Sequence, residues 1–112
     1  MESGAVFDEQ ISASSEHDNS LHSATRGRLR LPGSVSSAGS WTTVSNNVDE
    51  WLQIDLKSQG TKVSGVATQG RDTNSYEHWV TKYKLQYSND EVRFQYYSDQ
   101  GQTVDKVVFL YL

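Results

Sequence analysis

The 112-residue chain contains no cysteine and no long apolar run. The absence of cysteine excludes both a disulfide framework and a zinc site with thiolate ligands. No apolar stretch approaches the roughly 20 residues that a helix needs to cross a bilayer. The residues after Met1 also lack the basic and then apolar pattern of a signal peptide. We therefore expect neither a transmembrane segment nor a secretion signal within this chain.

Blocks of basic residues are missing as well. Ten Lys and Arg residues stand against fourteen Asp and Glu residues, which gives a formal net charge of −4. Nucleic-acid binding needs a basic face that displaces counterions, so no nucleic-acid partner is expected. The acidic balance also weakens electrostatic attraction to anionic membranes.

Sequence motifs of catalysis are absent too. The chain has no G-x-S-x-G elbow, no H-E-x-x-H and no phosphate-binding G-x-x-x-x-G-K. The three histidines lack the spacing of a zinc motif, and the ordinary interpretation places them at the surface. The sequence therefore predicts a protein that is not an enzyme and needs no cofactor.

Apolar residues instead recur at every second position, which is the period of a β-strand with one buried face. In the stretch 51–56, WLQIDL, Leu52, Ile54 and Leu56 share one face. The stretch 79–87 alternates in the same way, with Lys82 and Lys84 on its polar face. The pattern predicts strands over 10–14, 51–56, 62–69, 79–87 and 94–97, with a turn at 88–90 before the last.

A long irregular segment, residues 15–40, separates the first two predicted strands. It contains Gly and Pro among many serines, and loops of this length in compact domains are often functional. Short strands without an amphipathic helix predict a single all-β domain, an antiparallel sandwich or barrel. Trp41, Trp51 and Trp79 begin or flank strands, so we expect all three in its core.

Six stretches occur in an order that is typical of one family. They are QISASS (10–15), the pair Arg28-Leu29, Trp41, WLQIDL (51–56), KVSGVATQGR (62–71) and WVTKYKLQYSND (79–90). In this order they resemble the discoidin family, also called the coagulation factor V/VIII type C (F5/8 type C) domain. The resemblance covers about residues 8–97. It implies an antiparallel, jelly-roll-like, galactose-binding-like β-sandwich whose loops form spikes around a groove at one end.

The family's members are mostly extracellular adhesion or recognition modules that bind phospholipid headgroups, glycans, collagen or other proteins. Its domains have roughly 150 residues and close with a disulfide near their two ends, for which this chain has no cysteines. We therefore expect residues 1–112 to form one partial domain, truncated at both ends and incomplete at the C-terminus. Residues 98–112 are an atypical tail, because VVFLYL (107–112) is an uncharged β-prone run.

The resemblance places three spike loops on this sequence: a first loop at 16–23, a second loop at 46–50 and a third loop at 71–78. The ligand-binding candidates are Leu21, His22, Asn46, Asn47, Arg71, Asp72, Asn74, Tyr76, Glu77 and His78.

In the third loop, Arg71 can offer two parallel donors to a carboxylate, sulfate or phosphate. Tyr76 and His78 can stack on a sugar, and Asp72 and Glu77 can accept hydrogen bonds from hydroxyls. This combination of donor, acceptor and aromatic side chains suits a glycan or protein ligand. The alternative is structural, with Arg71 pairing with Asp72 or Glu77 to hold the loop.

The first loop offers less to a membrane or a metal. Its only large apolar side chain is Leu21, and at about 0.8 kcal/mol per buried methylene or methyl group a single Leu supplies little anchoring. Asp18 and Asn19 are calcium candidates, but calcium needs 6 to 8 oxygen ligands, which other groups would have to complete.

Arg26, Arg28 and Arg30 alternate along the chain. One interpretation is that three guanidinium groups line one side of an extended segment and bind an anion. The other, which the family pattern favours, is that Arg28 forms a partly buried ion pair while Arg26 and Arg30 are solvated.

The sequence thus predicts an extracellular or cell-surface adhesion module that binds glycans or matrix and membrane proteins through three loops. The first alternative is a phospholipid-binding domain that takes phosphatidylserine. The second is a truncated structural fragment without independent binding, which would associate through an exposed strand edge.

Overall fold

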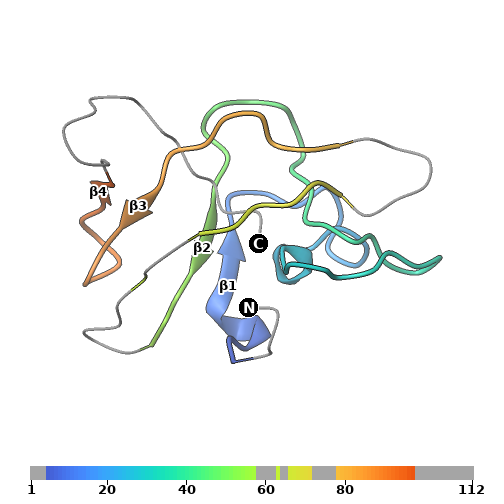
Figure 1. The fold of residues 1–112 in the computed structure, drawn as a ribbon, viewed down its shortest axis with the longest axis horizontal. Coiled ribbons are helices and arrows are strands. Elements are labelled where there is room, and N and C mark those ends of the chain that lie inside the picture. The colour runs from blue at the N-terminus through green and yellow to red at the C-terminus, as the bar shows by residue number, and fades with distance from the viewer. Residues whose placement is uncertain (1–4, 58–62, 64–65, 72–77, 98–112) are drawn as a thin grey trace.

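The fold is described by a computed structural model for residues 5–57, 63, 66–71 and 78–97 (Figure 1). Its elements are the 3-10 turn η1 (Asp8–Gln10), β1 (Ile11–Ala13), the 3-10 turn η2 (Ala24–Arg26), β2 (Leu52–Ile54), β3 (Gln86–Tyr87) and β4 (Gln95–Tyr96). The described ranges contain strands, 3-10 turns and loops but no α-helix. No helical element within them is long and apolar enough to cross a membrane. The all-β class is confirmed, whereas the jelly-roll arrangement stays a prediction.

Strands β1 and β2 form an antiparallel pair at the centre of the molecule (Figure 1). Ile11 lies opposite Ile54, and Ala13 opposite Leu52. The ladder continues beyond the strands, because the Asp55 N–H donates to the Gln10 carbonyl at 2.8 Å. This register puts the alternating apolar side chains of both strands on one face.

That face packs into a small core made of Ile11, Ala24, Trp41 and Leu52. Trp41 is the largest fully buried side chain among the described residues, with 2% of its surface exposed. Its indole N–H donates to the Ser15 carbonyl at 2.8 Å, so its one polar atom is satisfied inside the core. The long segment between β1 and β2 thereby folds back over the sheet.

Strands β3 and β4 form a separate antiparallel hairpin, with Gln86 opposite Tyr96 and Tyr87 opposite Gln95. Asp90 shapes the connection, because its Oδ1 accepts the backbone N–H groups of Val92 and Arg93 at 2.9 and 2.8 Å. These bonds to the carboxylate lower the pKa of Asp90. The predicted turn at 88–90 is therefore confirmed as the start of this hairpin connection.

The strands are shorter than the alternation predicts. The stretch 51–56 ends as a strand at Ile54, because the Asp55 carboxylate accepts the Lys57 N–H at 2.8 Å and Lys57 takes a left-handed φ of 60°. Leu56 is consequently 39% exposed and does not share the burial of Leu52.

The two later strand predictions are only partly met. In the stretch 79–87 the strand is confined to Gln86–Tyr87, and in 94–97 to Gln95–Tyr96. The described positions within 62–69 are not in a strand, and the rest of that stretch lies outside the described residues. The predicted tail, 98–112, also lies outside them.

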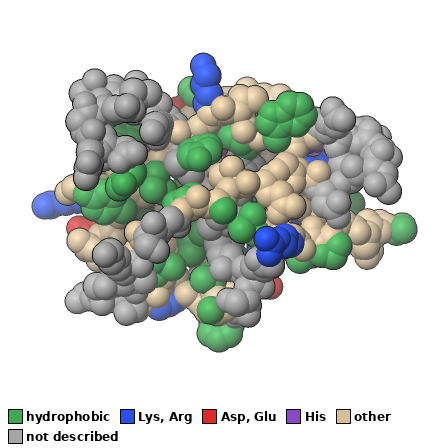
Figure 2. Space-filling view, viewed as in Figure 1, with side chains coloured by type: hydrophobic (Ala, Val, Ile, Leu, Met, Phe, Trp, Pro, Cys, Tyr) green, Lys and Arg blue, Asp and Glu red, His purple; other side chains and the backbone are tan. Residues whose placement is uncertain are grey.

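The prediction that all three tryptophans fill the core is wrong for two of them. Trp51 is 41% exposed and Trp79 is 64% exposed, whereas Trp41 is buried. Trp51 alternates with Leu52 and so points to the opposite face of β2, which no described core cluster covers. Figure 2 shows hydrophobic side chains at the surface among polar ones on the face it presents.

Candidate ligand-binding site

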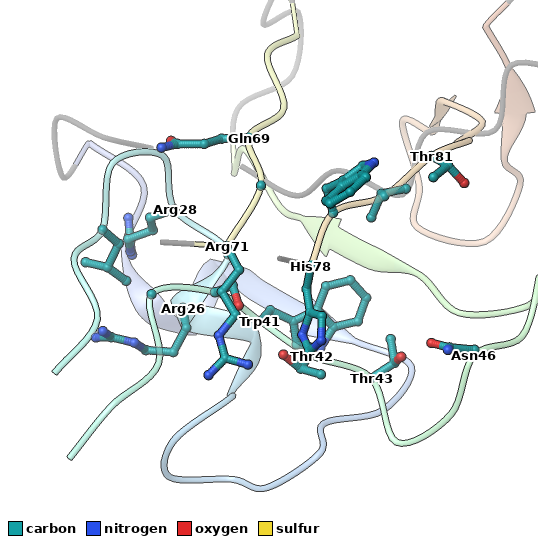
Figure 3. Close-up of a pocket in the computed structure, with 17 residues that line it drawn as sticks. Arg26, Arg28, Trp41, Thr42, Thr43, Asn46, Gln69, Arg71, His78 and Thr81 are labelled. Carbon is teal, nitrogen blue, oxygen red and sulfur yellow. The ribbon is translucent and has the colours of Figure 1, made fainter. Parts of the chain in front are cut away.

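A pocket of about 420 Å³ lies where the long segment between β1 and β2 meets the chain on either side of the third loop (Figure 3). Its described lining residues come from two stretches of sequence. The first supplies Arg26, Gly27, Arg28, Leu31, Gly39, Ser40, Trp41, Thr42, Thr43 and Asn46, and the second supplies Gln69, Gly70, Arg71, His78, Trp79, Val80 and Thr81. A cavity of this volume is large enough for a small ligand.

Trp41 gives the pocket a rigid base, because the same side chain belongs to the buried core. The next residue, Thr42, is fixed on both sides of its peptide. Its carbonyl accepts the His17 N–H at 2.7 Å, and its own N–H donates to the His22 carbonyl at 3.3 Å. The pocket wall is thus hydrogen-bonded to the first loop.

The two ends of the third loop are joined at the pocket edge. The Arg71 N–H donates to the His78 carbonyl at 2.8 Å, so both side chains stand beside the cavity. A Cβ atom on Gly70 would lie 3.4 Å from the His78 carbonyl oxygen and 3.5 Å from the Trp79 Cβ. The predicted contacts Asp72, Asn74, Tyr76 and Glu77 lie outside the described residues.

The second loop is held by the carboxylate of Glu50. This group accepts hydrogen bonds from the Ser14 hydroxyl at 2.5 Å, the Ser15 hydroxyl at 2.6 Å and the Asn47 amide at 3.0 Å. The bonds from Ser14 and Ser15 are the main reason that the pKa of Glu50 lies below its usual value. Asn46 lines the pocket, whereas Asn47 lies outside its described lining and holds Glu50.

Asp18 fixes the conformation of the first loop, whose residues lie outside the described lining of the pocket. Its Oδ1 accepts the backbone N–H groups of Ser20, Leu21 and His22, and its Oδ2 lies 2.9 Å from His22 Nδ1. The His22 contact, followed by the Leu21 N–H, pulls the pKa of Asp18 far below its ordinary value. The candidates Leu21 and His22 therefore lie outside the described lining of the pocket.

Two further expectations concern this loop. The His22 side chain is only 14% exposed and pairs with Asp18, so the prediction of a surface histidine is wrong at this position. Calcium binding by Asp18 and Asn19 stays a prediction. Within the described part of the chain, no three His, Cys, Asp or Glu side chains gather as a metal site would need.

The three alternating arginines have different surroundings. Arg28 forms the expected ion pair, with its Nη2 2.6 Å from Asp8 Oδ1 and its side chain only 14% exposed. The expectation that Arg26 is solvated is wrong, because its Nε donates to the Ala38 carbonyl at 2.8 Å and its Nη2 to the Ser37 hydroxyl at 3.1 Å. Arg30 is exposed and lies outside the described lining.

The structure thus brings together three predicted contacts, Asn46, Arg71 and His78, and adds others that the sequence interpretation missed. Thr42, Thr43, Gln69 and Thr81 are polar residues without a distinctive motif. Of these four residues, only Gln69 could have been expected near the site from the sequence, because it immediately precedes the Gly70-Arg71 end of the third loop. Its Oε1 accepts the Arg30 N–H at 2.9 Å, which connects the two parts of the chain that form the pocket.

Comparisons with known proteins agree with this architecture. The F5/8 type C domain model matches residues 10–110. The chain is 38% identical over 112 residues to EGF-like repeat and discoidin I-like domain-containing protein 3 of Homo sapiens, covering 96% of this chain and 22% of that protein.

Two further relatives have similar identities. Coagulation factor V of Sus scrofa is 36% identical over 110 residues, covering 96% of this chain and 5% of that protein. Lactadherin of Rattus norvegicus is 35% identical over 106 residues, covering 90% and 24%. The chain therefore spans a quarter or less of each of these relatives, and the match is at the level of one domain. The chain belongs to the F5/8 type C, or discoidin, domain family.

Proposed function

We propose that this domain is an extracellular recognition module that binds a glycan or an exposed group of a matrix or cell-surface protein. The observation that carries the proposal is the pocket itself. It combines the aromatic base at Trp41, neutral hydrogen-bonding side chains such as Thr43 and Asn46, and the donors of Arg71 and His78. Concave sites with a mainly apolar base and a few convergent polar groups are typical of ligand pockets.

The pocket walls are fixed before any ligand arrives. Glu50 holds the second loop to the end of β1, and the bond between Arg71 and His78 closes the third loop. Because folding already orders these groups, binding would require little additional loss of conformational freedom. This mechanism is recognition on a rigid scaffold, without a chemical reaction and without a cofactor.

Phosphatidylserine membranes rank below glycans and matrix proteins as the ligand. Leu21 is 36% exposed and is the large apolar side chain of the first loop. One such side chain, at about 0.8 kcal/mol per buried methylene or methyl group, falls short of stable anchoring. Tight sedimentation with phosphatidylserine liposomes that disappears in Leu21→Ala would reverse this ranking.

The proposal can be tested with a glycan array and a matrix-protein panel probed with the wild-type chain and the double variant Arg71→Ala/His78→Ala. Loss of the wild-type signal in the double variant is expected, because both side chains line the pocket. Arg93→Ala is the matched control, because Arg93 is exposed on the hairpin connection and outside the described lining.

Circular dichroism would verify that each variant is folded, and sedimentation would report any association with rising concentration. Unchanged binding in the folded double variant would place the site elsewhere. Concentration-dependent association without any ligand signal would support the alternative of a fragment that pairs through its strand edges.

A further inference from the structure

The charges around the pocket differ from those of the chain as a whole. The chain has a formal net charge of −4. The described lining residues nevertheless include three arginines, Arg26, Arg28 and Arg71, and contain neither Asp nor Glu. A concave site lined by one sign of charge concentrates ligands of the opposite sign. The described walls therefore favour an anionic group.

Arg26 is the most informative of these residues. Its guanidinium donates to the carbonyls of Ala38 and Pro32 and to the hydroxyl of Ser37, at 2.8, 3.3 and 3.1 Å. These acceptors carry no formal charge, and no carboxylate among the described residues pairs with Arg26. The segment around 32–38 thus fixes the orientation of a guanidinium whose positive charge no acidic side chain of the described ranges neutralises.

The other two arginines of the lining have different surroundings. Arg28 is paired with Asp8 at 2.6 Å, so its charge is largely balanced within the fold. Arg71 comes from the second stretch of the lining, and its backbone N–H donates to the His78 carbonyl. Arg26 and Arg71 therefore bring positive charge to one pocket from two distant parts of the sequence.

The pocket is chemically asymmetric. In the view of Figure 3, the three arginines lie on the left, whereas Thr43, Asn46 and Thr81 lie on the right, with Trp41 between the two groups. One side can thus pair with an anion, and the other can exchange hydrogen bonds with hydroxyl or amide groups. Trp79, which is 64% exposed at the rim, can pack against a sugar ring.

Building on the proposed glycan recognition, we propose that the pocket binds an acidic sugar, whose carboxylate or sulfate lies toward Arg26 and Arg71. The sugar hydroxyls face Thr43, Asn46 and Thr81. Arginine suits this role, because its guanidinium is always charged and donates through several N–H groups. The Nε and Nη2 hydrogens of Arg26 already bond Ala38, Pro32 and Ser37, so Arg26 offers the anion its positive charge and the N–H groups of Nη1. A neutral sugar of the same size would displace water from the guanidinium groups without supplying a counter-charge.

Isothermal titration with matched sugar pairs tests this specificity. Methyl glucuronide is compared with methyl glucoside, sialyllactose with lactose, and galactose 6-sulfate with galactose, so that carboxylate and sulfate are separate arms. Charged hydrogen bonds contribute enough for at least one acidic sugar to bind about tenfold more tightly than its neutral partner. Added NaCl should weaken only the acidic member of that pair.

The variant Arg71→Gln removes one charge from the pocket, and Arg93→Gln makes the same change on the exposed hairpin connection. The preference for the acidic sugar should fall about tenfold in Arg71→Gln and stay unchanged in Arg93→Gln. Arg26→Lys is a second pocket variant, which keeps the charge but loses the fork that contacts Ala38 and Ser37. Thermal melts verify that the variants are folded. The salt dependence is measured on the wild type, so it tests the inference even if a variant fails to fold.

The outcomes separate the inference from the proposed function. Neutral and acidic sugars that bind equally at the pocket would overturn the acidic specificity and leave glycan recognition intact. Absence of binding to every sugar would overturn the acidic specificity and would leave a protein group as the ligand of the proposed function. Acidic binding that is insensitive to Arg71→Gln and Arg26→Lys would overturn the inference by placing the site outside the pocket. Pocket-dependent binding to phosphatidylserine vesicles alone would replace the sugar with a lipid headgroup.

Discussion

The two strand pairs of this domain have the same antiparallel hydrogen bonding but very different surroundings. β1 and β2 join residues more than 35 positions apart, and Ile11 and Leu52 are only 6% and 7% exposed. β3 and β4 form a local hairpin, in which Tyr87 and Gln95 are 8 positions apart. Tyr87 and Tyr96 are 51% and 61% exposed. Backbone pairing is therefore a poor guide to burial in this chain.

The difference comes from what covers each pair. The segment between β1 and β2 folds back so that Ala24 and Trp41 pack against Ile11 and Leu52. The hairpin is held by local contacts, such as the bond from the Tyr87 hydroxyl to the Gln95 side chain at 2.9 Å. Because Trp41 also lines the pocket, the covered pair is the one that supports the candidate site.

The strongest test of this contrast is Trp41→Ala. It should lower the free energy of unfolding by about 3–5 kcal/mol, because it leaves a cavity in the core and removes the bond to Ser15. Urea denaturation followed by circular dichroism measures the loss. Trp51→Ala, at a 41% exposed position, is the matched control and should cost about 1 kcal/mol or less. Equal losses would mean that Trp41 is not the centre of the core.

A second test compares one residue from each pair. Leu52→Ala should destabilise the domain by about 2–4 kcal/mol, since its side chain is 7% exposed in the core. Tyr96→Ala should cost about 1 kcal/mol or less, because the ring is 61% exposed and its described partner is the Lys84 ammonium 5.4 Å away. A larger loss for Tyr96 in the same urea titrations would show that the hairpin is covered in solution.

A third test addresses Glu50, which ties the second loop to the end of β1. Glu50→Gln should lower stability at neutral pH by about 1 kcal/mol, because charged hydrogen bonds from Ser14 and Ser15 become neutral ones. Glu9→Gln, at an exposed position, is the control.

The same variant has a defined pH dependence. The folded pKa of Glu50 lies below its usual value of 4.5, so its contribution is complete above that value and is lost as the pH falls through the folded pKa. Wild type and Glu50→Gln should therefore converge in stability at acidic pH. A gap that persists there would assign the effect to side-chain shape rather than to charge.

The smallest effect is expected at the ion pair between Arg28 and Asp8. Asp8→Asn should lower stability by less than about 1 kcal/mol, because the Asp8 side chain is 70% exposed and solvent screens the pair. Thermal melts at low and high NaCl measure it, and the difference from wild type should shrink with salt. A salt-independent loss of several kcal/mol would indicate that the pair is effectively buried.

Part of the fold could be predicted from the sequence because alternation encodes which residues share a face. Leu52 and Ile54 indeed lie on β2, and the turn at 88–90 precedes β4. Alternation does not encode what covers a face. Trp51 and Trp79 were therefore misplaced in the core, and Leu56 was misplaced because the left-handed turn at Lys57 ends the strand.

The site was predictable only where a loop connects two recognisable strands. Arg71 and His78 stand at the two ends of the third loop, so a sequence that predicts this loop also predicts that the two residues lie close together. Arg26 and Thr43 belong to the long segment between β1 and β2, and whether they line the pocket depends on how that segment folds. Its path is set by hydrogen bonds such as that from Trp41 to Ser15, for which the sequence has no periodic signal.

The unequal burial of the three tryptophans gives the domain a built-in optical reporter. Trp41, at 2% exposure, should fluoresce as an indole shielded from water, whereas Trp51 and Trp79, at 41% and 64%, are accessible to a quencher such as acrylamide. Trp79 stands at the pocket rim and Trp51 lies outside the described lining. A ligand that enters the pocket should thus protect the fluorescence of Trp79 from quenching, so occupancy can be followed in solution without a label.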